Sequence, residues 1–277
     1  MLKKIMMGAA ALALSVTTLS GAANAGSIYL TGHDVLLHSN QNGYSTVILD
    51  WLRGAGTGSE IAAGSYRVGL VLSDPAAGFA STTTLDDYGG LTTLGLGAGT
   101  TAGAFTAFLG AIDVLVVPSH TSCGGCAFTT AASDILNGFS AEVTSFFNAG
   151  GDIWGNSSAT LASFYGFLPP SAVATGTSIG GSTGFAATAA GVAIGITDGS
   201  PSMINGFPTH NRFSSFDPDF TVFETRGDEV ISIGIRDATI GGGGIGTSDV
   251  PEPASMTLLG AGLAGVIGLV RRRRAAA

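Results

Sequence analysis

The sequence contains little charge and almost no lysine. Charged residues make up 11% of the 277 residues, and the only lysines are Lys3 and Lys4. Residues 26–249 carry 18 acidic residues against five arginines, a net charge of −13. A surface of that sign repels nucleic-acid phosphates and anionic lipid headgroups. The composition therefore argues against nucleic acid as a partner and favours cations or neutral glycans as ligands.

Cysteine is equally scarce. The two cysteines, Cys123 and Cys126, form one Cys-Gly-Gly-Cys sequence. In an exported chain we expect a local disulfide, and so short a loop removes little unfolded-state entropy. The bond would shape a loop rather than hold the fold together. A thioredoxin-like role is disfavoured because that motif opens a helix directly after a strand, whereas a polar loop intervenes here.

The N-terminus has the three parts of a secretory signal. Lys3 and Lys4 precede an apolar run over residues 5–19, and an Ala-x-Ala pattern ends at Ala25, before Gly26. We predict a signal peptide over residues 1–25, export by the Sec machinery, and cleavage by signal peptidase between Ala25 and Gly26.

The C-terminus combines a short motif, an apolar run and a basic stop. The motif is Val250-Pro251-Glu252-Pro253. Residues 254–270 carry no charge, and at ~1.5 Å per residue a helix over them would measure ~25 Å, near the short limit for crossing a bilayer. Arg271, Arg272, Arg273 and Arg274 follow and would stay on the cytoplasmic side. We predict a transmembrane helix over residues 254–270 with the preceding domain outside the cytoplasm.

These C-terminal residues resemble the PEP-CTERM sorting signal of Gram-negative bacteria. The resemblance implies recognition by an exosortase, transient anchoring in the inner membrane, later removal of the tail, and delivery to the cell surface or the extracellular matrix. It also implies a link to exopolysaccharide and biofilm. The expected order is a signal peptide (1–25), one domain (26–240), a glycine-rich linker (241–249) and the sorting signal (250–277).

Apolar segments with strand and helix patterns alternate along the domain. Continuous apolar strands point to a sheet that is covered on both faces. We predict an α/β fold with a mostly parallel sheet flanked by helices, in three layers, and short extra strands near the C-terminus. The expected strands are 27–30, 66–72, 112–117, 152–155, 192–196, 221–224 and 230–235, the last two as a hairpin, and the expected helices begin at Ser45 and cover 102–109, 135–148 and 159–167.

The body also resembles the class I glutamine amidotransferase-like fold, including its ThuA-like branch. The resemblance rests on segments 112–117, 146–151, 153–159 and 195–199. It implies a nucleophile elbow, Gly-x-Cys-x-Gly, after the strand 152–155. Ser157 stands at the cysteine position of that motif, while Ala159 replaces its second glycine.

The relay that would activate this serine is incomplete. The family's late His-x-Glu pair corresponds to His210, with Arg212 where the glutamate would stand. Ser157 and His210 are therefore the candidates for a Ser-His hydrolase, but a serine without an oriented base is a poor nucleophile. The alternative interpretation of Ser157 is a helix N-cap.

All four histidines fall in loops that follow predicted strands: His33, His38, His120 and His210. The carboxyl ends of parallel strands share one edge of a sheet, so these loops should converge. His120, Cys123 and Cys126 have a spacing that can bind a divalent metal if the thiols are reduced, with His33 or Asp34 as a further ligand. A disulfide would compete, and we expect no cofactor.

Three functions follow from these features. The first is a non-catalytic binding or structural domain displayed at the surface, linked to exopolysaccharide. The second is an envelope hydrolase that uses Ser157 on carbohydrate or peptidoglycan-related substrates. The third is a metal-dependent binding module.

Overall fold

The computed structural model describes most of the body of the chain. The described residues are 26–36, 42–54, 60–73, 83–120, 128–158, 161–170, 172, 174–198, 205, 208–240 and 245–247. The predicted signal peptide, His38, the two cysteines, the linker glycines 241–244 and the sorting motif lie outside them. Within the described part of the chain no helix has the length and hydropathy to cross a membrane, and the predicted span over 254–270 falls beyond it.

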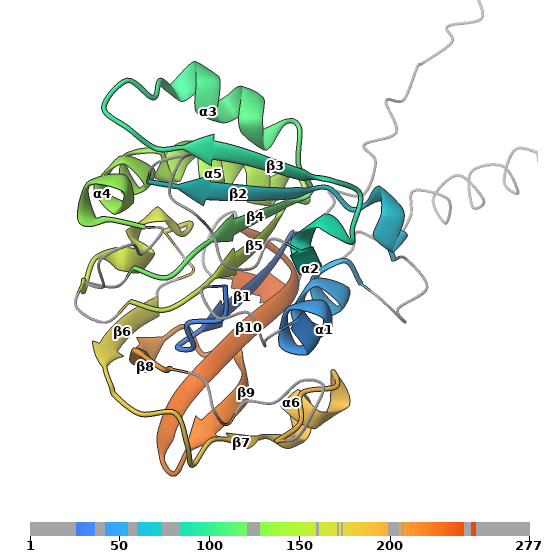
Figure 1. Ribbon diagram of the computed structural model, residues 1–277, viewed down its shortest axis with the longest axis vertical. Helices are drawn as coiled ribbons and strands as arrows, with labels where there is room; N and C mark the ends of the chain where they lie inside the picture. Colours follow the sequence, from blue (N-terminus) through green and yellow to red (C-terminus); the bar gives the residue numbers. More distant parts are fainter. Residues whose placement is uncertain are drawn as a thin grey trace, which may run out of the picture.

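Five parallel strands form the centre of the fold. They lie side by side in the order β3-β2-β4-β5-β1, as Figure 1 shows. Their bounds are β1 (Gly26–Thr31), β2 (Val68–Leu72), β3 (Leu91–Gly95), β4 (Val114–Val117) and β5 (Asp152–Gly155). Every residue of β1, β2, β4 and β5 is buried, as expected for apolar strands covered on both faces. The predicted α/β fold with a mostly parallel sheet is confirmed.

Antiparallel strands extend this sheet beyond β1. The long strand β10 (Glu229–Ile240) lies antiparallel to β1, and the order continues to β8 and β6. Gly227, at φ +60°, lies in the predicted hairpin turn between β9 and β10. The remaining bounds are β6 (Ala174–Ser178), β7 (Ala186–Ala187), β8 (Asn211–Phe216), β9 (Thr221–Arg226) and β11 (Ile245–Thr247), where β7 pairs with β9 and β11 with β10.

Helices cover both faces of the sheet. α1 (Asn42–Leu52) and α2 (Thr83–Asp86) pack on the face that carries Tyr29 and Trp154. The other face is covered by α3 (Ala102–Leu109), α4 (Thr130–Gly138), α5 (Ser140–Asn148) and the 3-10 helix η2 (Phe164–Phe167). Two short helices complete the set, η1 (Ala63–Ser65) and α6 (Ala189–Ala193). The result is the predicted three-layer arrangement (Figure 1).

Local signals explain where the sequence-based boundaries were wrong. The expected helix 135–148 is two helices: α4 ends at Gly138, a poor helix former, and Phe139 lies between α4 and α5. The segment 192–196 is not a strand. Thr188 caps the N-terminus of α6 by accepting from Gly191 N, and Gly195 at φ +99° ends it in a Schellman motif.

Two further expectations were wrong. The segment expected as a helix over 159–167 contains a turn followed by η2 in its described residues. The edge strand β3 was missed because its Thr92 and Thr93 are exposed and give no apolar run.

Candidate functional site

Polar side chains gather at the carboxyl ends of β1, β4 and β5. We call this group the carboxyl-edge cluster. Its members come from the loops after these three strands and from the segment that leads into β8. They are His33, Asp34, Ser119, His120, Asn156, Ser157, Ser158, Thr209, His210 and Asn211.

Ser157, the residue at the expected nucleophile position, is held in a structural contact. Its hydroxyl lies 3.0 Å from Oγ of Ser119, and its backbone N–H donates to the same oxygen at 3.3 Å. Both serines are fully buried. The carbonyl of Ser157 accepts from the backbone N–H of His120 at 2.8 Å, so the turn joins the ends of β4 and β5.

The neighbouring Ser158 is the serine that contacts a histidine. Its Oγ lies 3.3 Å from Nδ1 of His120, whose Nε2 lies 3.0 Å from Oγ1 of Thr130. The Ser158 oxygen also accepts from Leu161 N at 3.1 Å, which fixes the turn after β5. Burial lowers the pKa of His120, partly offset by its own backbone hydrogen bond and by the charge of Asp134. The imidazole is therefore a neutral hydrogen-bonding group near pH 7.

His210 lies at the end of β1 rather than beside Ser157's hydroxyl. Its Nε2 is 3.4 Å from Oδ2 of Asp34, and its backbone N–H donates to Gly32 O at 2.9 Å. The imidazole is 28% exposed while the Asp34 side chain is 4% exposed. The His210–Asp34 contact thus offers one polar group, the imidazole, to solvent at this edge.

Asn211 links the two halves of the cluster. Its Oδ1 accepts from Ser158 N at 2.8 Å and from the Tyr165 hydroxyl at 3.2 Å. Its Nδ2 and the Oδ1 of Asn156 are buried and have no hydrogen-bond partner among the described residues. Because Nδ2 of Asn211 lies against Gly176, where a Cβ would approach it to 3.3 Å, the glycine on β6 makes room for this amide.

Behind the edge, sequence reasoning missed a second polar group. We call it the tyrosine–glutamate cluster: Tyr29, His33, Tyr44 and Glu224, all fully buried. Glu224 accepts from both tyrosine hydroxyls, and its Oε2 lies 2.7 Å from Nε2 of His33. Burial, together with the Glu224 charge, raises the pKa of both tyrosines. The alternating pattern of β9 gave no sign that its glutamate points into the core.

The cluster joins distant parts of the chain. Nδ1 of His33 lies 2.7 Å from Oγ1 of Thr209, while Oε2 of Glu224 holds the other ring nitrogen. Tyr44 comes from α1 and Glu224 from β9, so the four side chains tie a helix, the central strand and the C-terminal hairpin together. His33 therefore has a structural role in addition to its position near the edge.

The predicted site residues do not form one centre in the described structure. Ser157 bonds to Ser119, His210 to Asp34, and His33 to Glu224 and Thr209. Among the described residues no three His, Cys, Asp or Glu side chains lie close enough together to hold a metal ion. The proposed metal ligands Cys123 and Cys126 lie outside those residues, so that hypothesis stays a prediction.

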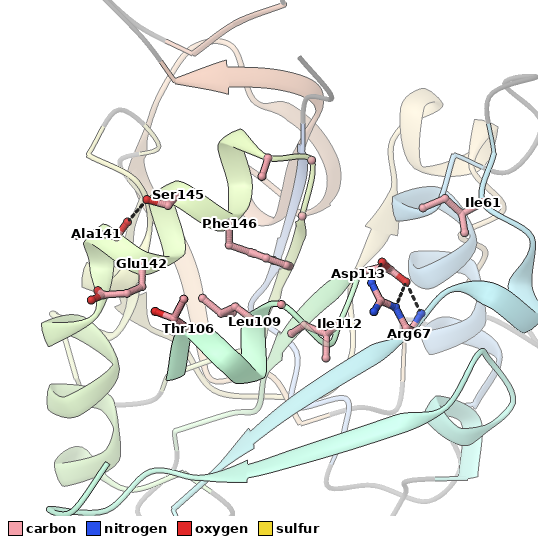
Figure 2. A pocket seen from close by; sticks show the side chains of 14 residues that line it. Ile61, Arg67, Thr106, Leu109, Ile112, Asp113, Ala141, Glu142, Ser145 and Phe146 are labelled. Carbon is pink, nitrogen blue, oxygen red and sulfur yellow. Dashed lines mark hydrogen bonds and ion pairs between the residues drawn. The ribbon is translucent and has the colours of Figure 1, made fainter. Parts of the chain in front are cut away.

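A hollow of about 630 Å³ lies at the opposite, amino edge of the sheet, and Figure 2 shows its lining. Leu109, Ile112 and Phe146 supply apolar walls, and the Arg67–Asp113 ion pair, with N···O 2.6 Å, closes one side. Glu142 is the other charged group among the described residues that line it, and these residues include no histidine and no bonded serine–base pair.

Comparison with known proteins explains the end of the chain. Residues 249–274 match the family described as the PEP-CTERM protein-sorting motif. The motif marks an exported protein that is sorted by an exosortase and located at the cell surface or in the extracellular space. No curated protein matches the sequence.

Proposed function

We propose that the exported domain is a non-catalytic binding domain whose carboxyl-edge cluster takes a neutral, hydroxyl-rich ligand such as an exopolysaccharide chain. The observation that carries the proposal is the state of Ser157. This serine is fully buried and bonded to Ser119, so a reacting carbonyl has no access to its oxygen. In this proposal the domain keeps an amidotransferase-like scaffold, has no accessible nucleophile, and uses the scaffold to bind its ligand.

The chemistry of the edge supports a neutral ligand. Hydroxyl, amide and imidazole groups dominate it, and its one carboxylate, Asp34, is already paired with His210. The body's charge of −13 disfavours anionic polymers. Sugar hydroxyls both donate and accept hydrogen bonds, so they can pair with the His210 imidazole, which is 28% exposed at this edge.

Binding to purified polysaccharides tests this proposal. The processed chain, in detergent, is mixed with a neutral glucan and, in parallel, with an acidic alginate, and co-sedimentation is measured. We expect retention on the neutral polymer and a loss of at least about tenfold in affinity for His210→Ala, which removes the exposed imidazole. Glu142→Gln, at the opposite edge, is the matched control and should bind normally. Equal binding by all three proteins, or binding by none, contradicts the proposal.

A second candidate function, an envelope hydrolase, is favoured by one contact. The 3.3 Å approach of Ser158 Oγ to His120 Nδ1 places a hydroxyl beside a neutral imidazole. The Ser158 oxygen must first leave its bond from Leu161 N, and no carboxylate bonds to His120 within the described residues. In this alternative Ser158, and not the predicted Ser157, is the nucleophile.

Ester hydrolysis separates the two functions. With p-nitrophenyl acetate as substrate, activity that disappears in Ser158→Ala and persists in Ser157→Ala would establish the hydrolase. Activity that is absent, or that both variants retain, leaves the binding domain as the better account.

A further inference from the structure

We infer that signal-peptide removal creates an ammonium group that the folded domain is built to hold: the new α-amino group of Gly26 lies near the Asp152 carboxylate and the carbonyl oxygens at the end of α5. The inference rests on cleavage before Gly26 and does not depend on the proposed ligand.

Gly26 is the first described residue of a central strand. It is buried, and it pairs with Ala238 of β10 on one side while the next residues pair with β5 on the other. A Cβ at this position would overlap the carbonyl oxygen of Gly151 and lie 2.9 Å from that of Phe147. Only glycine fits, so these two oxygens lie close to the Cα of residue 26.

The end of α5 directs those oxygens. Gly150, at φ +97°, closes the helix in a Schellman motif in which Gly151 N donates to Phe146 O at 2.9 Å. The last carbonyls of a helix carry partial negative charge, which favours a cation. Glycine is needed at Gly151 as well, because a Cβ there would overlap the Phe146 ring.

The Asp152 carboxylate lies on the β5 side of this position. Oδ1 of Asp152 accepts from Ser27 N at 2.7 Å, and Oδ2 accepts from the Tyr66 hydroxyl at 2.6 Å. The amino nitrogen of Gly26 is one residue away, ~3.5 Å along the strand, so it lies within ~6 Å of the carboxylate. At that range an opposite charge stabilises the ammonium form.

Few other charges face this position. Asp113 lies next along the same edge but is paired with Arg67. On β10 the Arg236 guanidinium lies over the Trp51 ring, 4.7 Å from its centroid. Glu142 is in the first turn of α5, at the far end of that helix. Asp152, with its bond from Tyr66, is therefore the main partner for the new cation among the described side chains.

The amine at Gly26 can be labelled without competition from lysine side chains. Lys3 and Lys4 leave with the signal peptide and no other lysine exists, so the processed chain has one primary amine, at Gly26. Only the neutral amine reacts with acylating reagents, and each unit by which its pKa is raised cuts the rate about tenfold near pH 7.

We would label the full exported chain, purified after processing, with an N-hydroxysuccinimide ester and follow its N-terminal peptide by mass spectrometry. The native chain should react at least about tenfold more slowly than the same chain unfolded in urea. A Gly-Ser-Gly insertion between Ala25 and Gly26 should restore the unfolded rate, because it moves the ammonium out of the site. Asp152→Asn should speed labelling, whereas the matched variant Asp113→Asn should not.

The charge also predicts a pH dependence. A raised pKa makes the stabilisation complete below the ordinary α-amino value of about 8 and lost as the pH rises through the folded value. The processed chain should melt at a higher temperature than the insertion variant at pH 7 and at the same temperature above about pH 10. Native labelling at the unfolded rate, a mature N-terminus other than Gly26, or an insertion variant that is equally protected would overturn the inference. If Asp152→Asn does not fold, the insertion variant decides the outcome.

Discussion

Removal of the Glu224 carboxylate should destabilise the protein more than loss of any surface ion pair. In Glu224→Ala, the hydroxyls of Tyr29 and Tyr44 and the Nε2 of His33 lose the group to which they bond. Each buried polar group left unsatisfied costs about 1–3 kcal/mol, although the Tyr29–Tyr44 contact at 2.9 Å relieves part of the loss. Breaking a buried hydrogen-bonded pair of this kind costs ~3–5 kcal/mol in total.

Urea unfolding followed by tryptophan fluorescence measures this cost. Trp51 reports on the cluster because its ring centroid lies 5.8 Å from that of Tyr29. We expect the free energy of unfolding to fall by ~3–5 kcal/mol and the melting temperature by roughly 6–20 °C for a domain of this size. The control is Glu229→Ala, which removes a 28% exposed carboxylate paired with Arg226 and should cost ~1 kcal/mol or less. A Glu224→Ala loss no larger than the control's would refute the role assigned to this cluster.

Three smaller perturbations follow from the same structure. Burial raises the pKa of Asp113, but the hydrogen bonds and charge of Arg67 outweigh it and hold the pKa below its ordinary value. Asp113→Asn should therefore cost up to ~1 kcal/mol at pH 7, and this cost should shrink as the pH falls below the ordinary aspartate value of about 4, by urea unfolding. Gly195→Ala forces an L-residue to φ +99° and should cost about 1–2 kcal/mol, whereas Gly103→Ala, in an open helical position, should be neutral or stabilising in the same melts. Because burial lowers the pKa of His120, wild-type stability should fall as the pH drops below about 6.5, and His120→Gln should flatten that slope in thermal melts between pH 7 and 5.

The sequence predicted the parallel core well because β2, β4 and β5 are short apolar runs that end in polar turns. It also predicted that polar loops would meet at the carboxyl edge; the structure places the contacts His33–Thr209 and His210–Asp34 there, while no common centre of the predicted residues forms among the described residues. The sequence did not predict which side chains of these loops bond to each other. Which serine meets His120 depends on how the turn after β5 is fixed by Leu161, and that geometry depends on tertiary contacts.

Two kinds of residue gave misleading signals. Small residues such as those of Ala189–Ala193 fit helix or strand, and the N-cap Thr188 and the C-terminal Gly195 decide for helix. Glu224 looks solvent-exposed in any pattern based on polarity, because only the three-dimensional structure brings His33 and two tyrosines to it. Buried charged networks of this type are set by long-range contacts and leave no local pattern.

Strand direction also explains why the two ends of the domain meet. β1 begins at Gly26, so this residue lies at the amino edge of the parallel sheet. Because β10 runs antiparallel to β1, it returns to that edge, where Ala238 pairs with Gly26 on one side and with Thr247 of β11 on the other. Strands of four to six residues, at ~3.3 Å each, place the carboxyl-edge cluster ~13–20 Å away. The first and last described strands of the domain therefore meet at one edge of the sheet, and the carboxyl-edge cluster lies at the other.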